Sequence, residues 1–263
     1  MGYTVITGAC GGLGRAFAEL LAERKEKLIL TGRSEVRLQE LCEDLSSRCG
    51  IQPIVFAMDL TDLSSRKAFE EFLSKNGYAV ERLINVAGAD IQKGFAEYSQ
   101  EKIAFQARVN FEGPVSLCRI AIECKDEEKT LEIINVSSVS GIYPMPYFAI
   151  YSATKRALWS FSVALREEGR RQGWKVTAVL PGAMPTREDV KAQIRGQGLW
   201  GKLAAKSPKF VAQKSLKAVA KNKRTCIPGF ANKCMNFGTK LIPLSWKLKF
   251  IAKRWSKISK DAF

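Results

Sequence analysis

Histidine is absent from this sequence of 263 residues. Its absence excludes Ser-His-Asp chemistry and removes the commonest metal ligand. The seven cysteines are odd in number and form no Cys-x-x-Cys pair, so neither a disulfide framework nor a cysteine-rich zinc site is expected. We therefore predict reduced cysteines that serve in packing, and no metal centre.

Long hydrophobic runs are also missing. No apolar stretch approaches the roughly 18 residues that a membrane-spanning helix needs. The sequence enters a strand-like run at once, without the pattern of a signal peptide. Together these features lead us to expect a cytoplasmic protein.

Acidic residues are nearly absent from the C-terminal quarter, where Asp261 is the single one. Between Val190 and Lys260 there are 18 Lys and Arg and no Asp or Glu, while the rest of the chain has 24 basic and 26 acidic residues. The net charge of +16 is therefore the sum of −2 and +18. Such asymmetry points to an acidic partner, either a nucleic acid or an anionic membrane surface. We rank nucleic acid last, and expect none to bind, because no nucleic-acid-binding module appears.

What is present is a regular alternation of apolar runs and helical patterns. Most of the runs lack polar alternation, as in strands buried on both faces of a parallel sheet. The fold class is therefore α/β, with a doubly wound parallel sheet of about seven strands in three α/β/α layers. Strands are expected at Tyr3–Thr7, Lys27–Thr31, Pro53–Ala57, Arg82–Val86, Leu131–Val136, Lys175–Leu180 and Thr225–Pro228. Helices are expected at Leu13–Arg24, Ser34–Arg48, Ser64–Lys75, Gln100–Glu123, Ile150–Gln172 and Pro208–Lys221.

A glycine cluster follows the first strand. Its spacing is Gly-x-x-x-Gly-x-Gly, and a helix begins directly after it. Glycines allow a pyrophosphate to approach the main chain, and a helix N-terminus offers free N–H groups to it. The cluster therefore favours a nucleotide over the alternative, a tight turn that needs glycine only for its shape. It runs Thr7-Gly8-Ala9-Cys10-Gly11-Gly12-Leu13-Gly14.

The end of the second strand bears on the choice of cofactor. Dinucleotide folds usually place an acid there for the ribose 2′-hydroxyl, but this chain has Gly32 and Arg33. Because arginine binds a 2′-phosphate bidentately, we favour NADP(H) over NAD(H), although a solvated Arg33 opening a helix is the alternative. Asp59 and Leu60 are candidates to frame the adenine, unless Asp59 is only a cap on the approach to a helix.

The most specific stretch combines a strand-end serine with a Tyr-x-x-x-Lys pattern. Ser138 follows a buried strand, and Tyr151 and Lys155 are four residues apart, so they share one helix face. An ammonium group beside a phenol lowers the phenol's pKa and moves it toward acid–base use near neutral pH. A lone pair of this kind is often an ordinary surface pair, but the preceding serine makes chance much less probable.

With these motifs in order, residues 1–229 resemble a short-chain dehydrogenase/reductase of the short, single-domain type. Ser138 lies thirteen residues before Tyr151, the interval usual in that family. The chain has Val86 where the family commonly has a second asparagine, a departure that does not touch the chemistry. The resemblance rests on the glycine loop, Asp59, Asn85-Val86-Ala87-Gly88, Asn110 in Val-Asn-x-x-Gly, Ser138, Tyr151-x-x-x-Lys155 and Pro181-Gly182-Ala183-Met184-Pro185-Thr186.

The resemblance implies a role for each catalytic position. Tyr151 would give the proton to a carbonyl oxygen or take it from an alcohol, and Lys155 would lower the tyrosine pKa and hold the nicotinamide ribose. Ser138 would hydrogen-bond the substrate oxygen. Asn110 would keep a water and the helix geometry that link Lys155 to solvent.

The resemblance also implies a Rossmann-like fold and a set of residues that contact the dinucleotide, in which the cofactor supplies the hydride. This expected cofactor set is Gly8, Cys10, Gly11, Gly12, Leu13, Gly14, Arg33, Asp59, Leu60, Asn85, Ala87, Gly88, Tyr151, Lys155, Pro181, Gly182 and Thr186.

A substrate lid is expected at about residues 183–207. It contains Trp200 among apolar and basic residues, and Met145 and Tyr147 precede Tyr151 as another apolar wall. These residues suit a lipophilic carbonyl or secondary alcohol, such as a 3-oxoacyl or a steroid- or bile-acid-like compound. Equally, they are suited simply to pack the lid on the sheet.

Residues 230–263 form a basic, amphipathic tail in this interpretation. Leu244, Leu248, Ile251, Trp255 and Ile258 fall on one helical stripe, with basic residues mostly off it. Such a helix is typical of a peripheral contact with an anionic membrane. Docking on its own domain, a subunit interface and simple solvation remain as alternatives.

The sequence thus predicts an NADP(H)-dependent oxidoreductase, a ketoreductase or alcohol dehydrogenase. It is expected to form a homo-oligomer, a dimer or a tetramer. The alternative is a dinucleotide-binding redox sensor without turnover.

Overall fold

The computed structural model describes residues 2–186 and 205–256. Seven parallel strands form one sheet in the order β3-β2-β1-β4-β5-β6-β7. This arrangement confirms the predicted doubly wound α/β fold, and the predicted strands lie within one or two residues of the observed ones. The strands are β1 Tyr3–Thr7, β2 Leu28–Gly32, β3 Ile54–Ala57, β4 Val80–Asn85, β5 Leu131–Val136, β6 Trp174–Val179 and β7 Thr225–Cys226.

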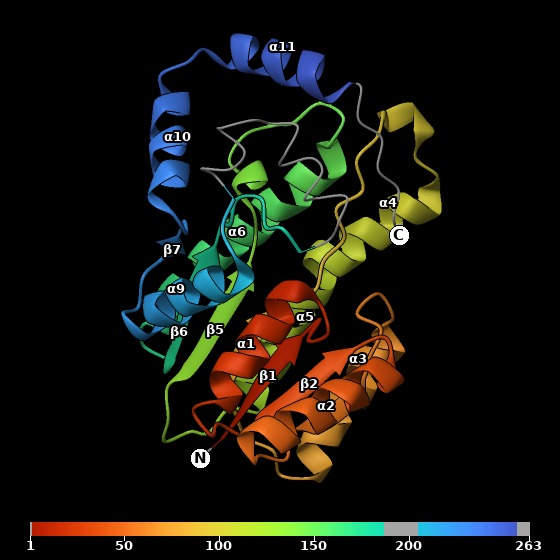
Figure 1. Cartoon of the computed structure of the whole chain (residues 1–263), viewed down its shortest axis with the longest axis vertical. Coiled ribbons are helices and arrows are strands. Elements are labelled where there is room, and N and C mark those ends of the chain that lie inside the picture. Colours follow the sequence, from red (N-terminus) through yellow and green to blue (C-terminus); the bar gives the residue numbers. More distant parts are fainter. Residues whose placement is uncertain (1, 187–204, 257–263) are drawn as a thin grey trace.

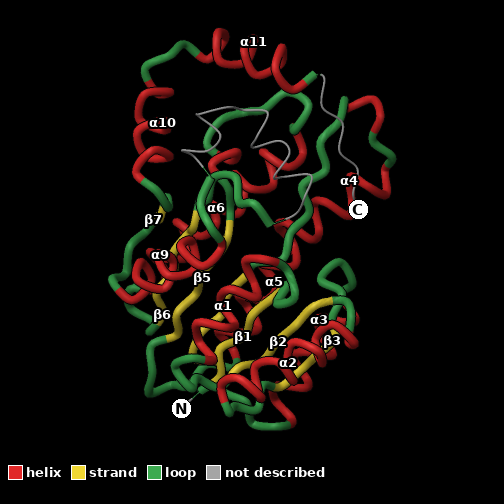
Figure 2. The backbone as a smooth tube through the Cα atoms, in the orientation of Figure 1, coloured by secondary structure: helices red, strands yellow, loops and turns green. Residues whose placement is uncertain are grey.

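Helices cover both faces of the sheet (Figures 1 and 2). Within the described residues, the α-helices are α1 Gly12–Ala22, α2 Glu35–Cys49, α3 Leu63–Lys75, α4 Gln100–Ala107, α5 Gly113–Glu123, α6 Ala149–Gly169, α9 Pro208–Ala220, α10 Phe230–Lys240 and α11 Leu244–Trp255. Short 3-10 turns lie at η1 Phe95–Glu97 and η3 Val139–Gly141, and a π-helical turn lies at η2 Arg108–Glu112.

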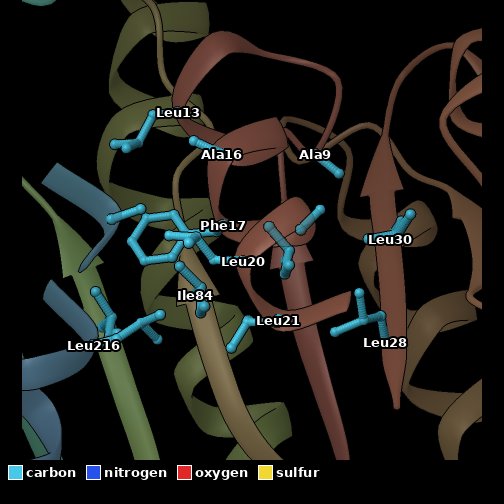
Figure 3. Close-up of a cluster of buried hydrophobic side chains, with 14 of the residues drawn as sticks. Ala9, Leu13, Ala16, Phe17, Leu20, Leu21, Leu28, Leu30, Ile84 and Leu216 are labelled. Atoms are coloured by element: carbon cyan, nitrogen blue, oxygen red, sulfur yellow. The ribbon is translucent and has the colours of Figure 1, made fainter. Parts of the chain in front are cut away.

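Each strand sends alternate side chains to two separate cores. Ile6 packs with α1, α2 and α9, whereas its neighbour Val5 packs with α3 and α5 on the opposite face. Phe17 and Leu216 meet over the first face, where Figure 3 shows them beside Ile84. Burial on both faces explains why the strands lack polar alternation in the sequence.

The helix ends follow the polar residues at their borders. The Ser34 hydroxyl accepts a hydrogen bond from the Arg37 amide and caps α2, and Gly50 ends that helix with a φ of 60°. Ser207 caps α9 in the same way, with Pro208 in the first turn. The two serine caps fix where the loops before α2 and α9 end, and Gly50 fixes where the loop before β3 begins.

The single helix expected over Gln100–Glu123 is interrupted. The π-helical turn at Arg108–Glu112 joins α4 to α5 and contains the buried Asn110. Such turns occur frequently at functional sites, and periodicity does not reveal one extra residue in a turn.

The C-terminal residues form two helices rather than one. α10 and α11 are joined at Pro243 and lie at the outer edge of the molecule, with α11 crossing beyond α6 (Figure 1). Among the described helices, none has the length and apolar character needed to traverse a lipid bilayer.

Candidate active site

A cleft of about 620 Å³ opens at the carboxyl ends of the strands. The chain order reverses between β1 and β4, which is where open α/β sheets bind their ligands. The size suits a small ligand or cofactor. Sixteen of the seventeen predicted cofactor residues line it, the exception being Asn85; the lining also includes Ser138.

The glycine loop forms one wall of the cleft. Gly8 has a φ of 62°, and the Gly11 amide donates a hydrogen bond to the Gly8 carbonyl oxygen at 2.9 Å. A Cβ atom on Gly14 would overlap that same carbonyl group. The loop therefore requires glycine at both ends of this tight turn.

The first turn of α1 faces this loop. Gly11 provides no side-chain cap to the helix, and no acidic residue lies in the first turn. Free N–H groups and the positive end of the helix dipole make such a terminus an anion site. The loop and helix thus fit the pyrophosphate of a dinucleotide.

Two arginines lie beyond the glycine loop. The Arg33 guanidinium lies 6.0 Å from the centroid of the Phe105 ring, and Arg37 Nη2 donates to the Cys10 carbonyl oxygen at 3.4 Å. Both line the cleft. Arg37 was not among the predicted residues, although its position in the first turn of α2, four residues after Arg33, is the signal that identifies it.

Asp59 and Leu60 line the cleft on the other side of β2. Asp59 Oδ1 accepts hydrogen bonds from the amide and the hydroxyl of Thr61, both at 2.8 Å. The cap of α3 is Asp62 and not Asp59. Asp59 therefore shapes the loop after β3 while it faces the cleft.

The loop after β4 is held by Thr7. Its hydroxyl accepts hydrogen bonds from the amides of Val86 and Ala87 at 3.0 and 3.1 Å. Asn85, which we expected at the cofactor, points away from the cleft: its Nδ2 donates to Asn135 Oδ1 at 2.9 Å inside the sheet. That expectation is corrected, because the Asn85 side chain is buried between β4, β5 and α5.

Asn110 fixes the continuation of this loop. Its side chain exchanges two hydrogen bonds of 2.9 Å with the backbone N–H and C=O of Ala89, and its Nδ2 donates to Thr154 Oγ1 at 3.3 Å. A Cβ on Gly88 would lie 2.8 Å from Asn110 Oδ1 and 3.1 Å from Lys155 Nζ. Asn110 is thus a positioning residue, and its expected water stays a prediction.

Ser138, Tyr151 and Lys155 meet at the carboxyl end of β5. The Ser138 hydroxyl hydrogen-bonds the phenol of Tyr151. Lys155 Nζ donates to the Val136 carbonyl oxygen at 3.0 Å and lies 5.8 Å from the centroid of the Tyr151 ring. The Ser137 hydroxyl donates to the Lys155 carbonyl oxygen at 2.7 Å, which ties α6 to the strand.

The pKa values differ from the expectation for this pair. Burial raises the pKa of Tyr151 well above its usual value, the carboxylate of Asp90 raises it further, and only the Ser138 hydrogen bond lowers it. Burial also lowers the pKa of Lys155 to about 8, an effect that Asp90 opposes. The predicted lowering of the Tyr151 pKa by Lys155 is therefore wrong, since burial and Asp90 raise this pKa and the one lowering contribution comes from Ser138.

Asp90 is a further cleft residue that the sequence reasoning missed. It follows the Asn85–Ala89 segment directly, and its charge acts on both Tyr151 and Lys155. Asp90 lies two residues after Gly88 and is not part of any motif that the sequence offers. The feature that could have identified it is its position in the loop after β4, which faces the cleft.

The residues expected at the substrate separate. Met145 is buried against Phe148 and Ile251 of α11, and Tyr147 is partly exposed with a φ of 63°; neither lines the cleft. Trp200 and most of the expected lid lie outside the described residues. Met145 thus packs against the stacked rings of Phe148 and Tyr151. The centroids of these two rings are 4.3 Å apart.

Comparison with known proteins agrees with this geometry. Residues 3–195 match the family model for short chain dehydrogenases. The chain is 32% identical to dehydrogenase/reductase SDR family member 7B of Mus musculus, over 84% of this chain and 71% of that protein. It is 29% identical to very-long-chain 3-oxoacyl-CoA reductase of Bos taurus, over 85% of this chain and 70% of that protein.

A solved structure shows the same fold. A short-chain dehydrogenase from Sphingobium yanoikuyae in complex with NADPH aligns with a TM-score of 0.78 at 26% identity, covering all of this chain and 98% of that one. Nicotinamide dinucleotides are the cofactors of this fold. The chain therefore belongs to the short-chain dehydrogenase/reductase family, whose enzymes oxidise alcohols or reduce carbonyl groups.

Proposed function

We propose that this enzyme transfers a hydride between NADP(H) and a lipophilic carbonyl or secondary alcohol, with Tyr151 as general acid and base. The proposal rests on one observation: Ser138, Tyr151 and Lys155 lie together in the cleft whose glycine loop fits a dinucleotide. The bound cofactor supplies or accepts the hydride. The catalytic domain comprises residues 1–229 in this proposal, with a lid at about 183–207.

Side chains of the protein transfer the proton that accompanies the hydride. Because burial raises the Tyr151 pKa, the phenol is protonated near neutral pH and ready to donate to a carbonyl oxygen. Ser138 orients that oxygen through its hydroxyl. Lys155, with a pKa of about 8, keeps much of its positive charge at neutral pH and stabilises the phenolate that remains.

The preference for NADP(H) rests on Arg33 and Arg37. Both guanidinium groups lie at the edge of the cleft where the adenosine ribose would bind, next to the end of β2. At the end of β2, where an acid would repel a 2′-phosphate, this chain has Gly32. The NADPH bound to the 26% identical relative is in keeping with this preference.

The substrate class follows from the apolar surroundings of Tyr151. Phe148 stacks on its ring, and Tyr143, Met145 and Ile251 pack around this stack, which makes the surroundings of Tyr151 apolar although these residues do not line the cleft themselves. The name of the related bovine enzyme, a very-long-chain 3-oxoacyl-CoA reductase, supports a lipophilic substrate. Asp90 also lines the cleft, and its carboxylate disfavours substrates that carry a negative charge close to the reacting carbonyl.

A turnover assay tests the proposal. NADPH and NADH oxidation would be compared over a panel of long-chain 3-oxoacyl, steroid and short water-soluble ketones. We expect turnover with NADPH and rising kcat/KM with apolar chain length. Tight NADPH binding without turnover of any ketone or alcohol would instead support the redox sensor.

A further inference from the structure

The polarity of α10 is inverted relative to an ordinary surface helix. Its domain-facing side carries Asn232, which is only 3% exposed, together with the partly buried Asn236 and Thr239. Its outer side carries Phe230, 82% exposed, and the exposed Phe237. Water therefore contacts the apolar side, an arrangement that marks an interaction site.

α11 continues this surface but divides its apolar residues between two faces. Ile251 is buried on Met145 and Phe148, and Trp255 packs beside it, so this part of the predicted stripe faces the enzyme itself. Leu244, at the start of the stripe, is 49% exposed, and Ile258 lies outside the described residues. On the opposite side, Trp246 and Phe250 are 69% and 68% exposed. Lys247 Nζ donates to the Thr239 carbonyl oxygen at 2.8 Å and joins the two helices.

The charge around these exposed residues decides between two partners for this surface, a second copy of the chain and an anionic bilayer. The segment 230–256 contains Lys233, Lys240, Lys247, Lys249, Lys253 and Arg254 and no acidic residue. A two-fold interface would bring this patch against its own copy, where like charges repel. An anionic bilayer instead complements the charge and accepts the aromatic side chains at its interface.

We propose that the outer face of α10 and α11 is a docking surface for an anionic lipid bilayer. This outer face consists of Phe230, Phe237, Leu241, Ile242, Trp246 and Phe250, all exposed. Their side chains enter the interfacial region, while Lys249, Lys253 and Arg254 of the same helix contact lipid head groups. The protein is held peripherally, by a face other than the predicted stripe.

The inner side of α11 gives this docking a consequence for the reaction, which rests on the proposed function. Ile251 and Trp255 lie in one cluster with Phe148 and Tyr151. A helix with one side in the lipid interface and the other over the catalytic tyrosine places the cleft beside the bilayer. Carbonyl compounds dissolved in the membrane then reach Tyr151 without crossing bulk water.

Vesicle co-sedimentation of the full chain tests the docking surface. We expect the protein to sediment with phosphatidylglycerol vesicles, and much less with phosphatidylcholine vesicles. The double variant Trp246→Ser and Phe250→Ser should lose at least ten-fold in partitioning. A matched variant, Val36→Ser with Phe95→Ser, removes two exposed apolar side chains elsewhere and should bind as wild type does.

The charges are tested separately. Lys249→Gln, Lys253→Gln and Arg254→Gln together should weaken binding by about five-fold per charge removed. Lys217→Gln, Lys221→Gln and Lys223→Gln lower the net charge equally within the same basic quarter but outside the two helices, and should have a smaller effect. Equal losses in the two triple variants would overturn the proposal.

The competing occupant is a second copy of the chain. If the outer face were a subunit interface, Trp246→Ser with Phe250→Ser would lower the oligomeric state in sedimentation velocity and leave vesicle binding unchanged. That result overturns the proposal, as does equal recovery of the wild type with and without anionic vesicles.

Turnover separates this inference from the proposed function. The outer-face double variant should reduce a short water-soluble ketone as fast as wild type, but lose the activation by vesicles seen with a membrane-dissolved ketone. An enzyme inactive on every ketone that still binds vesicles would refute only the proposed function. An active enzyme without vesicle binding would refute only the docking surface.

Discussion

The ammonium group of Lys155 lies 5.8 Å from the centroid of the Tyr151 ring and hydrogen-bonds the carbonyl oxygen of Val136 at 3.0 Å. The lysine is therefore anchored to the end of β5 beside the tyrosine ring. Burial is the main cause of both pKa shifts. It keeps the phenol protonated, and it lowers the pKa of the ammonium to about 8. This combination favours proton donation near neutral pH.

The pH dependence of ketone reduction should follow Lys155. Because its pKa is about 8, its positive charge is present below that pH and is lost as the pH rises through it. We expect kcat/KM for reduction to fall on the alkaline side with a midpoint near this value. A rate that stays level to pH values where free lysine titrates would contradict the role of the ammonium.

Asp90 sets where that alkaline decline occurs. Its carboxylate raises the pKa of Lys155, so Asp90→Asn should lower this pKa and move the decline to lower pH. The same substitution should also lower the Tyr151 pKa, because Asp90 raises it as well. Glu128→Gln, which removes an exposed acid at the other end of β5, is the matched control and should leave the profile in place.

Gly88 must remain without a side chain. A Cβ there would lie 2.8 Å from Asn110 Oδ1 and 3.1 Å from Lys155 Nζ, so Gly88→Ala forces both groups to move. We expect a loss of about 1–3 kcal/mol in the free energy of unfolding and a marked loss of turnover. Gly238→Ala, with no atoms within 4 Å of the added carbon, should not destabilise the protein; equal effects in urea unfolding would argue against this crowding.

Arg33 and Arg37 should discriminate between the two cofactors. Charged hydrogen bonds contribute roughly 1.5–3 kcal/mol, so replacing each arginine by serine should raise the KM for NADPH about 10- to 100-fold. The KM for NADH should change little. Arg48→Ser, on the same helix but away from the cleft, is the control. Equal effects on both cofactors would count against a 2′-phosphate site.

Much of this fold could be predicted because its signals are local. Buried strands such as β1 have apolar residues on both faces, and Ser34 and Ser207 mark helix starts by their capping chemistry. The family motifs indicated the glycine loop and the Ser138–Tyr151–Lys155 cluster. These features depend on neighbours along the chain or on a fixed motif interval.

The remaining features depend on tertiary packing. The π-helical turn that holds Asn110 adds one residue to a helix that reads as continuous, and Met145 is buried only because Ile251 of α11 folds back onto it. Likewise, spacing alone placed an ammonium near the Tyr151 phenol, but only the structure gives the burial that raises its pKa. The inverted polarity of α10 is visible only once its neighbours are known.

The most direct test of the account is the turnover of Tyr151→Phe. The variant keeps the ring that stacks on Phe148 and removes only the hydroxyl group that carries the acidic proton, so NADPH affinity measured by fluorescence titration should stay within about two-fold. Ketone reduction should fall by roughly 10²- to 10⁴-fold, the contribution of a positioned general acid. Reduction at a rate near that of the wild type, with NADPH still bound, would contradict the assignment of Tyr151 as the proton donor.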